Sequence, residues 1–404
     1  MKHFFSVLVL FAAMTLIVSF AGCPQESEDD TPDTDYSGVS ALEFASLMRI
    51  GWNLGNTLDA HNNMNPRETA WGNQPAAQEL INTVAAQGFG AVRIPVTWGN
   101  TIGSPPEYTI DSAWLDRVAE VVEYVRSAEM IAIINIHHDG ADSGYWLSVK
   151  ANDITGVAKD NIDAKFSAVW KQIAAHFKNT GNFLVFEGFN ELHDGSWGNG
   201  STAQRNRVNE LNQIFVDAVR STGGRNIDRF LVVSGWVTRP SLLRHLVMPA
   251  DSAQDKLIAN FHYYDPYDFS GSASWNAWGS KANPSGSRAW ANESYVQSTF
   301  DDVKTRFIDK GIPVIIGEYG AVRQATETGK SHRLYYMEYV TKYAIDCGFI
   351  PFYWDNGGAN AGREGFGLFN RRSPYGLLSD TAEVIAVMMK AVNEDYPLPE
   401  IPPP

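Results

Sequence analysis

Eight short apolar runs alternate with amphipathic stretches along most of the chain, and this rhythm limits the possible folds more than any other feature. Each run is rich in β-branched and other apolar residues, as buried strands are. The predicted strands are Met48–Leu54, Ala91–Val96, Ile131–His137, Phe183–Phe189, Arg229–Gly235, Leu257–Tyr263, Pro313–Glu318 and Ile350–Trp354. Runs that are apolar along their length and polar at their C-terminal end are typical of a parallel sheet or barrel.

The stretches between the runs have apolar residues at spacings of three and four, which predicts helices. The predicted helices are Ala76–Gln87, Ala113–Ala128, Asp163–Lys178, Ala203–Ser221, Pro240–Val247, Glu293–Asp309, His332–Asp346 and Thr381–Asn393, with a short one over Val39–Leu47 that would close the bottom of the fold. Expected helix boundaries are N-caps at Ser112 and at Ser379 or Asp380, and terminal glycines at Gly88, Gly223, Gly311 and Gly348.

Eight strand–helix pairs predict an α/β fold, a (β/α)₈ TIM barrel that forms a single domain over residues 39–397. An open doubly wound sheet is the alternative. That fold usually carries a Gly-x-Gly-x-x-Gly turn after its first strand, whereas the first strand here ends in Gly51-Trp-Asn-Leu-Gly-Asn.

The two ends of the chain are expected to lie outside this domain. Residues 1–22 have the basic start, apolar run and small final residues of a secretory signal peptide. The following Cys23 completes a sequence similar to a bacterial lipobox, which predicts a lipid anchor; plain secretion is the alternative. Residues 23–38 are predicted to be an acidic disordered linker, and residues 398–404 a Pro-rich tail. We therefore expect a secreted protein, or one at the bacterial cell surface or outer membrane, that meets the membrane only through Cys23.

Composition restricts the partners of the chain. The 32 basic residues against 46 acidic ones give a net charge of −14, which argues against a nucleic-acid partner. Twelve Trp, 16 Tyr and 21 Phe belong in part to the core, and Trp beyond core needs suggests flat platforms for sugar rings; for any single Trp, packing in the core is the alternative. The only cysteines are Cys23 and Cys347, so lipidation of the first would exclude an intrachain disulfide.

Polar or aromatic side chains stand at the end of every predicted strand, where active sites of such barrels gather. In strand order they are Asn53, Arg93, His137 with His138, Asn190 with Glu191, Trp236, His262 with Tyr264, Glu318, and Trp354. Two carboxylates that flank one bond, one protonated and one ionised, are the machinery of glycoside hydrolysis. We expect Arg93 to pair with Glu318 and keep it ionised, because an arginine inside an apolar strand needs an acidic partner. A purely structural ion pair is the alternative.

Other chemistries fit the pattern less well. His137 and His262 are alternative metal ligands. Metal-dependent barrels of the amidohydrolase kind, however, need His-x-His on the first strand, and Met48–Leu54 contains no histidine. The acidic loop Asp139–Asp142 has no calcium-loop spacing, and no Gly-x-Ser-x-Gly elbow is present. We expect no metal and no cofactor. Glu187 lies four residues before Glu191, on the same face and lower in the barrel, and is expected to support the site rather than to react.

Five segments carry a specific resemblance. They are Gly51-Trp-Asn-Leu-Gly-Asn-Thr-Leu-Asp59, Val92-Arg-Ile-Pro-Val-Thr-Trp98, Ile133-Ile-Asn-Ile-His-His138, Glu187-Gly-Phe-Asn-Glu191 and Ile315-Ile-Gly-Glu-Tyr-Gly320. Together they resemble the endoglucanases of glycoside hydrolase family 5, and most closely the bacterial branch that cuts cellulose, mixed-linkage β-glucan and xyloglucan. The resemblance implies a retaining endo-β-1,4-glucanase that acts on such a β-glucan; we expect it to be a monomer.

The resemblance also implies a role for each matching residue. Glu191 would be the general acid/base and Glu318 the nucleophile, with carboxyl groups about 5 Å apart. Asn190 would bind the 2-hydroxyl of the sugar, and Arg93 and Tyr264 would hold Glu318. The remaining roles are His262 near Glu191, His137 near the sugar hydroxyls, and Trp354 as the floor of the subsite.

The substrate groove is less defined by the sequence. His138, Trp146, Trp197, Trp236, Trp275 and Trp278 either line the groove or pack in the core. The long segment Asp265–Asn292 is expected to contact substrate. A xyloglucanase, a lichenase or a mannanase would use the same machinery. A surface glycan-binding lipoprotein without catalysis is the alternative from a different class.

Overall fold

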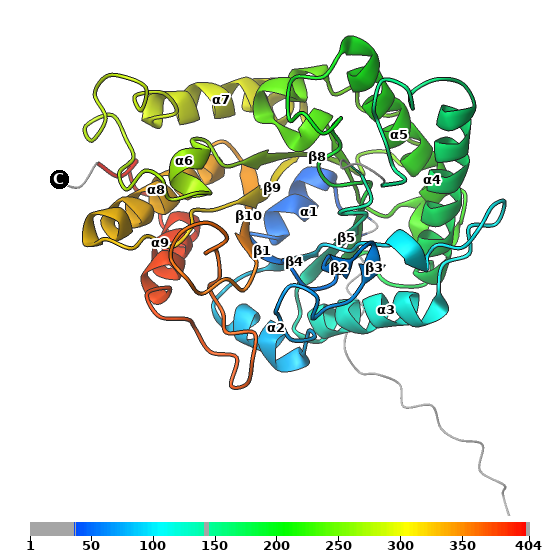
Figure 1. The fold of residues 1–404 in the computed structure, drawn as a ribbon, viewed down its shortest axis with the longest axis horizontal. Coiled ribbons are helices and arrows are strands. Elements are labelled where there is room, and N and C mark those ends of the chain that lie inside the picture. Colours follow the sequence, from blue (N-terminus) through cyan, green and yellow to red (C-terminus); the bar gives the residue numbers. More distant parts are fainter. Residues whose placement is uncertain (1–35, 37, 141–144, 401–404) are drawn as a thin grey trace, which may run out of the picture. The chain divides into compact units, whose positions relative to one another are not determined.

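The structure is a computed structural model that describes residues 36, 38–140 and 145–400, all within one compact unit. Its centre is a closed barrel of parallel strands in the order β1-β10-β9-β8-β7-β6-β5-β4 (Figure 1). The predicted TIM barrel is therefore confirmed. The expected signal peptide, Cys23, most of the linker and the last residues of the tail lie outside the described residues, as does part of the acidic loop Asp139–Asp142.

The barrel strands match the predicted apolar runs and are generally shorter. They are β1 (Gly51–Leu54), β4 (Ala91–Ile94), β5 (Ile131–Asn135), β6 (Leu184–Glu187), β7 (Leu231–Ser234), β8 (Leu257–Tyr263), β9 (Val314–Tyr319) and β10 (Phe349–Asp355). Strand β8 has the predicted bounds. Several predicted strands included polar residues that the structure places in the loops just beyond the strand, among them His137.

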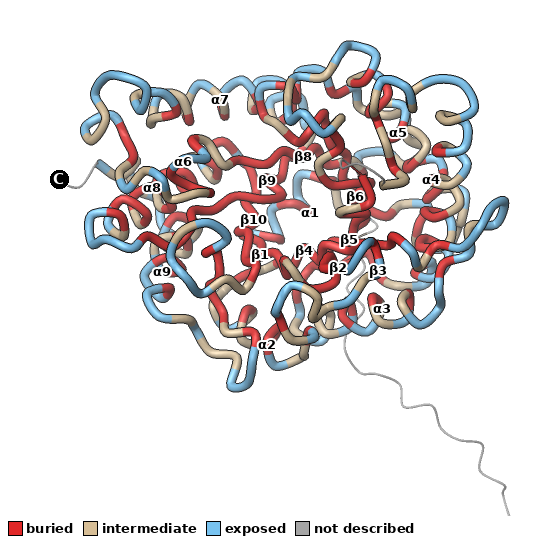
Figure 2. The backbone as a smooth tube through the Cα atoms, in the orientation of Figure 1, coloured by how far each residue is buried: buried red, intermediate tan, exposed pale blue. Residues whose placement is uncertain are grey.

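Helices cover the outside of the barrel (Figure 1). They are α2 (Gln78–Ala86), α3 (Ser112–Ser127), α4 (Gly156–His176), α5 (Thr202–Arg220), α7 (Glu293–Arg306), α8 (Glu327–Asp346) and α9 (Ala382–Asn393). The barrel strands and the inward faces of these helices are buried (Figure 2). Among the described residues, no helix is both long and apolar enough to cross a membrane.

Shorter elements occupy the connections. They are the hairpin β2 (His61–Asn62) and β3 (Asn65–Pro66), the helix α6 (Tyr267–Ser270), and the 3₁₀ turns η1 (Gly99–Thr101), η2 (Gly224–Ile227), η3 (Trp236–Thr238), η4 (Pro240–His245) and η5 (Ile308–Lys310). The helix predicted at Pro240–Val247 was wrong, because only the 3₁₀ turn η4 forms there. It follows a strained turn and is too short to build α-helical hydrogen bonds over several turns.

The predicted helix ends are partly correct. Gly88, Gly223, Gly311 and Gly348 all have positive φ, as terminal glycines should. The N-cap of α3 is Asp111, which accepts from the backbone of Ala113, and not the predicted Ser112. Helix α9 begins after Thr381 without a side-chain cap, so the prediction of Ser379 or Asp380 was wrong too.

The short helix α1 (Ala41–Leu47) closes the bottom of the barrel, as predicted. Its Ser40 and Glu43 form a capping box. Phe44 is fully buried and stacks on Phe230, just before β7, with ring centroids 3.8 Å apart. The Lys256 ammonium, just before β8, donates to the Val39 carbonyl at 2.7 Å. The N-terminal ends of the strands are thus sealed, and the opposite ends remain for the site.

The barrel interior changes from apolar to polar along the strands. Ile133 and Val185 belong to the apolar cluster that packs on α1. Two residues further along the same strands, and therefore on the same face, stand Asn135 and Glu187. A floor of buried polar groups thus lies between the apolar bottom and the open end.

Strand β9 contains a bulge that the sequence did not predict. Phe261 and His262 of β8 pair with Ile316 and Glu318, so one extra residue, Gly317, interrupts the ladder. A bulge turns the following side chain to the other face of its strand. Glu318 therefore faces the barrel interior, although it is an odd number of residues from the interior Ile315.

Candidate active site

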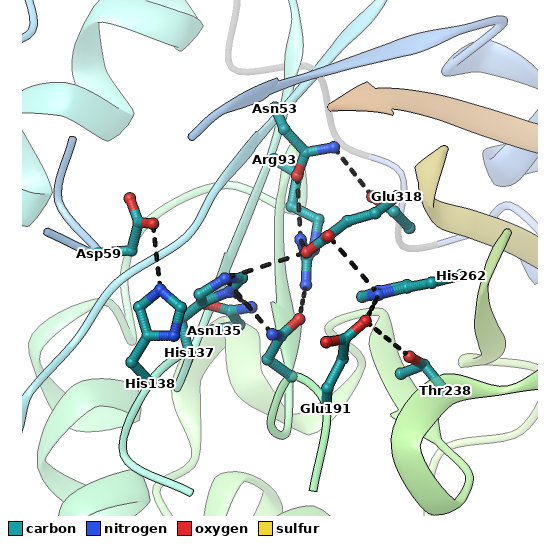
Figure 3. Close-up of polar contacts among 12 residues, drawn as sticks. Asn53, Asp59, Arg93, Asn135, His137, His138, Glu191, Thr238, His262 and Glu318 are labelled. Atoms are coloured by element: carbon teal, nitrogen blue, oxygen red, sulfur yellow. Dashed lines mark hydrogen bonds and ion pairs between the residues drawn. The ribbon is translucent and has the colours of Figure 1, made fainter. Parts of the chain in front are cut away.

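Arg93 on β4 connects the polar floor to the site above it (Figure 3). Its guanidinium donates twice to Glu187, at 2.6 and 2.9 Å, and once to Glu318, at 2.8 Å. It also donates to Asn53 at 2.9 Å and to Asn190 at 2.8 Å. The expected pairing with Glu318 is confirmed, but Glu187 is the bidentate partner. Sequence reasoning placed Glu187 below the site and missed this contact, which the alternation of side chains along neighbouring parallel strands could have suggested.

Glu318 is held by two donors. Besides Arg93, the Tyr264 hydroxyl donates to Glu318 Oε2 at 3.1 Å. Burial and the neighbouring Glu318 carboxylate raise the pKa of Tyr264 well above its ordinary value, so Tyr264 remains a donor. A carboxylate fixed by a cation and a hydroxyl is oriented for attack and stabilised as the anion.

Glu191 has a different surrounding. It follows β6 and lies opposite His262, whose Nδ1 is 2.7 Å from Glu191 Oε1 and 3.7 Å from Glu318 Oε2. The Thr238 hydroxyl lies 3.4 Å from the same Glu191 oxygen (Figure 3). A carboxylate oxygen of Glu191 lies within 4.8 Å of one of Glu318. Retaining glycosidases have carboxyl groups about 5 Å apart, whereas inverting ones are at about 6.5 Å or more.

The two carboxyl groups influence each other. Burial raises the pKa of Glu318, and the nearby Glu191 charge adds to this, against His262 and Arg93. Burial acts the same way on Glu191, but the hydrogen bond and charge of His262, with His193 and Arg93, outweigh it and lower the pKa of Glu191. A proton donor at Glu191 would need the opposite order, in which the pKa of Glu191 is the higher of the two.

The tautomer of His262 decides which order applies. A protonated Nδ1 donates to Glu191 and stabilises its carboxylate. In a neutral ring with its hydrogen on Nε2, Nδ1 instead accepts from the Glu191 carboxyl group, which then keeps its proton. Arg93 and Tyr264 favour the ionised form of Glu318 in both cases, so a neutral His262 ring of this tautomer would leave Glu191 protonated beside an ionised Glu318.

His137 forms the wall of the site beside Glu318. Its Nδ1 contacts Asn135 at 3.2 Å and its Nε2 contacts Asn190 at 3.3 Å. Burial, with His138, Arg93 and His262 nearby, lowers the pKa of His137 well below its ordinary value, so the ring is neutral. The His137 ring stacks parallel to Trp354, with ring centroids 5.8 Å apart. Trp354 on β10 is the register partner of Asn53 on β1.

A row of rings extends from this wall toward solvent. His138 lies against His137, with centroids 4.5 Å apart, and against Trp71 at 5.2 Å. His61 of β2 contacts both His138 and Trp71. The buried Asp59 carboxylate lies 3.4 Å from His138 Nε2. Sequence reasoning missed Trp71 and His61, which lie far beyond a strand end and reach the site only because the hairpin folds back.

The other predicted aromatic residues divide into two groups. Trp236 is only 2% exposed and Trp278 is buried among tyrosines of α8, so both pack in the interior. Trp146 is half-buried and donates to Asp139. Trp275 is half-buried beneath Arg288 in the long segment Asp265–Asn292. Trp197 is 52% exposed and rests on His193.

Two groups of described side chains are close enough to share one metal ion: Asp59 with His137 and His138, and Glu191 with His262 and Glu318. Both groups belong to the site already described. Every member except Asp59 also has a predicted role, either in contacting the sugar or in the two-carboxylate chemistry.

Comparisons with known proteins identify the family of the chain. The family model for cellulase (glycosyl hydrolase family 5) matches residues 55–360. Endoglucanase A from Paenibacillus barcinonensis is 37% identical over 385 residues, which cover 91% of this chain and 94% of the relative.

Solved structures give the same result. A GH5-4 broad specificity endoglucanase from Bacteroides salanitronis superposes with a TM-score of 0.84 and 47% identity, over 88% of this chain and 95% of that one. A family 5 xyloglucanase from Paenibacillus pabuli superposes with a TM-score of 0.80 and 39% identity, over 87% and 100%. The chain belongs to glycosyl hydrolase family 5, the cellulase family, and is a glycoside hydrolase.

Proposed function

We propose that this protein is a retaining endo-β-1,4-glucanase. The observation that supports the proposal best is the pair of carboxyl groups with oxygens within 4.8 Å, one of which is fixed by Arg93 and Tyr264. This separation leaves room for an anomeric carbon but not for an additional attacking water. The endoglucanase relatives support the class of substrate.

The reaction has two steps. In the first, the Glu318 carboxylate attacks the anomeric carbon while Glu191 gives its proton to the leaving glycosidic oxygen, which forms a glycosyl ester on Glu318. In the second, Glu191 takes a proton from water, and the oxygen of that water attacks the same carbon and releases Glu318. Two inversions give net retention. Asn190, whose Oδ1 accepts from Arg93 at 2.8 Å, directly precedes Glu191, and its amide is the group that would bind the sugar 2-hydroxyl.

Substitution of the two carboxyl groups tests this proposal. Glu318→Gln removes the nucleophile, and we expect kcat on barley β-glucan to fall on the order of 10⁴-fold or more. Glu191→Gln should reduce kcat by about 10²- to 10⁴-fold. Binding of cellotetraose should persist in Glu318→Gln. Wild-type protein that binds β-glucan without releasing reducing ends would instead identify a glycan-binding protein.

The configuration of the product is a separate test. Nuclear magnetic resonance of the first sugars released from cellotetraose should show the β-anomer before mutarotation. Initial appearance of the α-anomer would contradict the double-displacement mechanism.

We further propose that the enzyme accepts several β-1,4-linked glucans, including xyloglucan. The similarity to a broad specificity endoglucanase and to a xyloglucanase supports this breadth. Initial rates on carboxymethyl cellulose, barley β-glucan, xyloglucan and mannan would test it. A preference for mannan would contradict the choice of glucan.

We also propose export of the protein and attachment through a lipid on Cys23, with monomeric enzyme acting at the cell surface. The apolar N-terminal run and the Phe-Ala-Gly-Cys sequence support this. Partitioning of wild-type and Cys23→Ala protein between membrane and soluble fractions of a bacterial host tests it. Equal distribution of the two would contradict a lipid anchor.

A further inference from the structure

The His137 ring lies between two side-chain amides. The Asn135 amide nitrogen is 3.2 Å from Nδ1 of the ring (Figure 3). On the other side of the ring, the Asn190 amide nitrogen is 3.3 Å from Nε2. Asn135 is the last residue of β5 and is fully buried. The family resemblance gave no role to Asn135.

The orientation of each amide is fixed by a donor on its other side. Asn135 Oδ1 accepts the Val96 N–H at 3.1 Å, and Asn190 Oδ1 accepts from the Arg93 guanidinium at 2.8 Å. A backbone N–H and a guanidinium can only donate, so neither amide can turn its oxygen toward the ring without losing this bond. Both ring nitrogens of His137 therefore face NH₂ groups, which are donors.

A neutral imidazole has one hydrogen, so only one of its nitrogens can accept. A hydrogen on Nδ1 would point at the buried Asn135 amide nitrogen, and no described residue accepts a hydrogen bond from Nδ1. A buried donor without an acceptor is unfavourable. A hydrogen on Nε2 instead points into the site, where Glu318 Oε1 lies 3.9 Å away. That distance is too long for a direct hydrogen bond, so this hydrogen stays available.

We propose that Asn135 is a positioning residue that donates to Nδ1 and so places the single hydrogen of His137 on Nε2. The Asn190 amide then has no acceptor in the ring and keeps its hydrogens for the substrate. Two donors 3.3 Å apart thus remain for the hydroxyl oxygens of a sugar held at Glu318. The inference rests on the proposed function for the identity of this acceptor, and it adds the residue that sets both donors.

Nitrogen NMR of the wild-type protein measures the tautomer directly. In protein labelled with ¹⁵N in histidine, a ring nitrogen that carries a hydrogen and one that does not have clearly different chemical shifts. The signals that disappear in His137→Gln identify the ring. At about pH 8, where an ordinary histidine is neutral, we expect a hydrogen on Nε2 of His137 and none on Nδ1. A hydrogen on Nδ1, or on both nitrogens, would overturn the proposal.

The variant Asn135→Asp reverses the contact with little change of shape. One carboxylate oxygen can still accept from Val96, and the other faces Nδ1 as an acceptor. We expect the hydrogen to move to Nδ1, after which Nε2 accepts from Asn190 and the ring no longer donates to the sugar. We expect kcat/KM on cellotetraose to fall about tenfold, the effect of one hydrogen bond on a barrier.

The variant Asn226→Asp is the matched control. Asn226 is fully buried as well, but it lies in η2, before β7 and at the sealed end of the barrel, where its amide donates to the Ala174 carbonyl at 2.6 Å. It should leave the His137 signals and kcat/KM per folded molecule unchanged. Equal falls in kcat/KM in both variants would overturn the proposal. A fall in Asn135→Asp without movement of the hydrogen, or full activity after that movement, would overturn it too.

The two proposals can fail separately. The wild-type spectrum assumes nothing about the reaction, so it identifies the tautomer even if the protein hydrolyses no glucan and the proposed function fails. If Glu318→Gln abolishes turnover but His137 carries its hydrogen on Nδ1, the proposed function stands and only the role of Asn135 is lost.

Discussion

Arg93 and Glu187 form a buried ion pair directly below the site. Both side chains are fully buried, and Glu187 receives two of the hydrogen bonds that Arg93 donates. Loss of one partner from a buried pair leaves the other charge uncompensated. The pair therefore stabilises the fold and also fixes the site, because the same guanidinium donates to Glu318 and Asn190.

We predict that Glu187→Gln lowers the free energy of unfolding by about 3 kcal/mol. Urea denaturation followed by fluorescence measures this. Activity should fall as well, because a guanidinium with a weakened anchor orients Glu318 less well. The control Glu68→Gln weakens the partly exposed pair with Arg117 and should cost about 1 kcal/mol or less. Equal costs at the two positions would contradict a special role for Glu187.

His137 should make stability depend on pH. Its pKa in the folded protein lies well below the ordinary value, whereas in the unfolded chain it is about 6.5. As the pH falls below about 6.5, the unfolded chain binds a proton that the folded protein refuses, so stability is lost toward acid pH, by at most about 1.4 kcal/mol per pH unit.

The variant His137→Gln tests this sign. Its melting temperature should fall less than that of the wild type when the pH is lowered from about 7 to about 5. Other acidic and histidine groups titrate in both proteins and cancel in the comparison. Parallel melting curves would show that His137 is not held neutral by the fold.

At the scale of elements, the bulge in β9 explains why a glycine precedes Glu318. A Cβ on Gly317 would lie 2.5 Å from Asn260 Oδ1, which accepts the Gly317 N–H at 3.0 Å. The Gly317 carbonyl accepts from Asn53 at 2.9 Å. Both amides of the polar floor thus pack directly on the bulge that aims Glu318.

We predict that Gly317→Ala destabilises the protein by about 1 to 3 kcal/mol through overpacking. It should also lower activity beyond the loss of folded protein, because Asn260 cannot move without shifting the bulge. Thermal melts and kcat on β-glucan measure the two effects. Gly376→Ala places its Cβ in open space and should change stability by less than about 0.5 kcal/mol. Full activity in Gly317→Ala would show that the bulge tolerates a side chain.

The sequence predicts the barrel and most of the site because both follow from local patterns. Strand β8 is an apolar run flanked in the sequence by polar residues, so its bounds can be read from the sequence. Arg93, His137 and Glu318 stand at or near strand ends, which the barrel topology brings together. The bulge at Gly317 follows from how neighbouring strands pair, which no single segment reveals. The orientation of the Asn135 amide is set by a contact with Val96, which lies beyond the neighbouring strand.

At the scale of the whole molecule, stability and chemistry lie at opposite ends of the barrel. Helix α1 seals the N-terminal ends of the strands through Phe44, and the carboxyl pair lies beyond the C-terminal ends. We predict that Phe44→Ala lowers the free energy of unfolding by about 3 to 5 kcal/mol. Activity per folded molecule should remain that of the wild type.

Leu42→Ala, on the exposed face of the same helix, is the matched control and should change stability by less than about 0.5 kcal/mol. Urea denaturation and active-site titration separate the two quantities. A fall in specific activity in Phe44→Ala would show that α1, at the N-terminal ends of the strands, influences the site at their C-terminal ends.

The position of α1 also fixes the end of the barrel at which the described chain begins. Tyr36 packs edge-to-face on Phe44, so the chain enters the fold at the sealed end. An attachment made through the residues before Tyr36 would pull on the barrel at that end. The carboxyl pair lies at the opposite end of the barrel from that point of attachment, so the proposed anchor would leave the open end free for a long glucan chain.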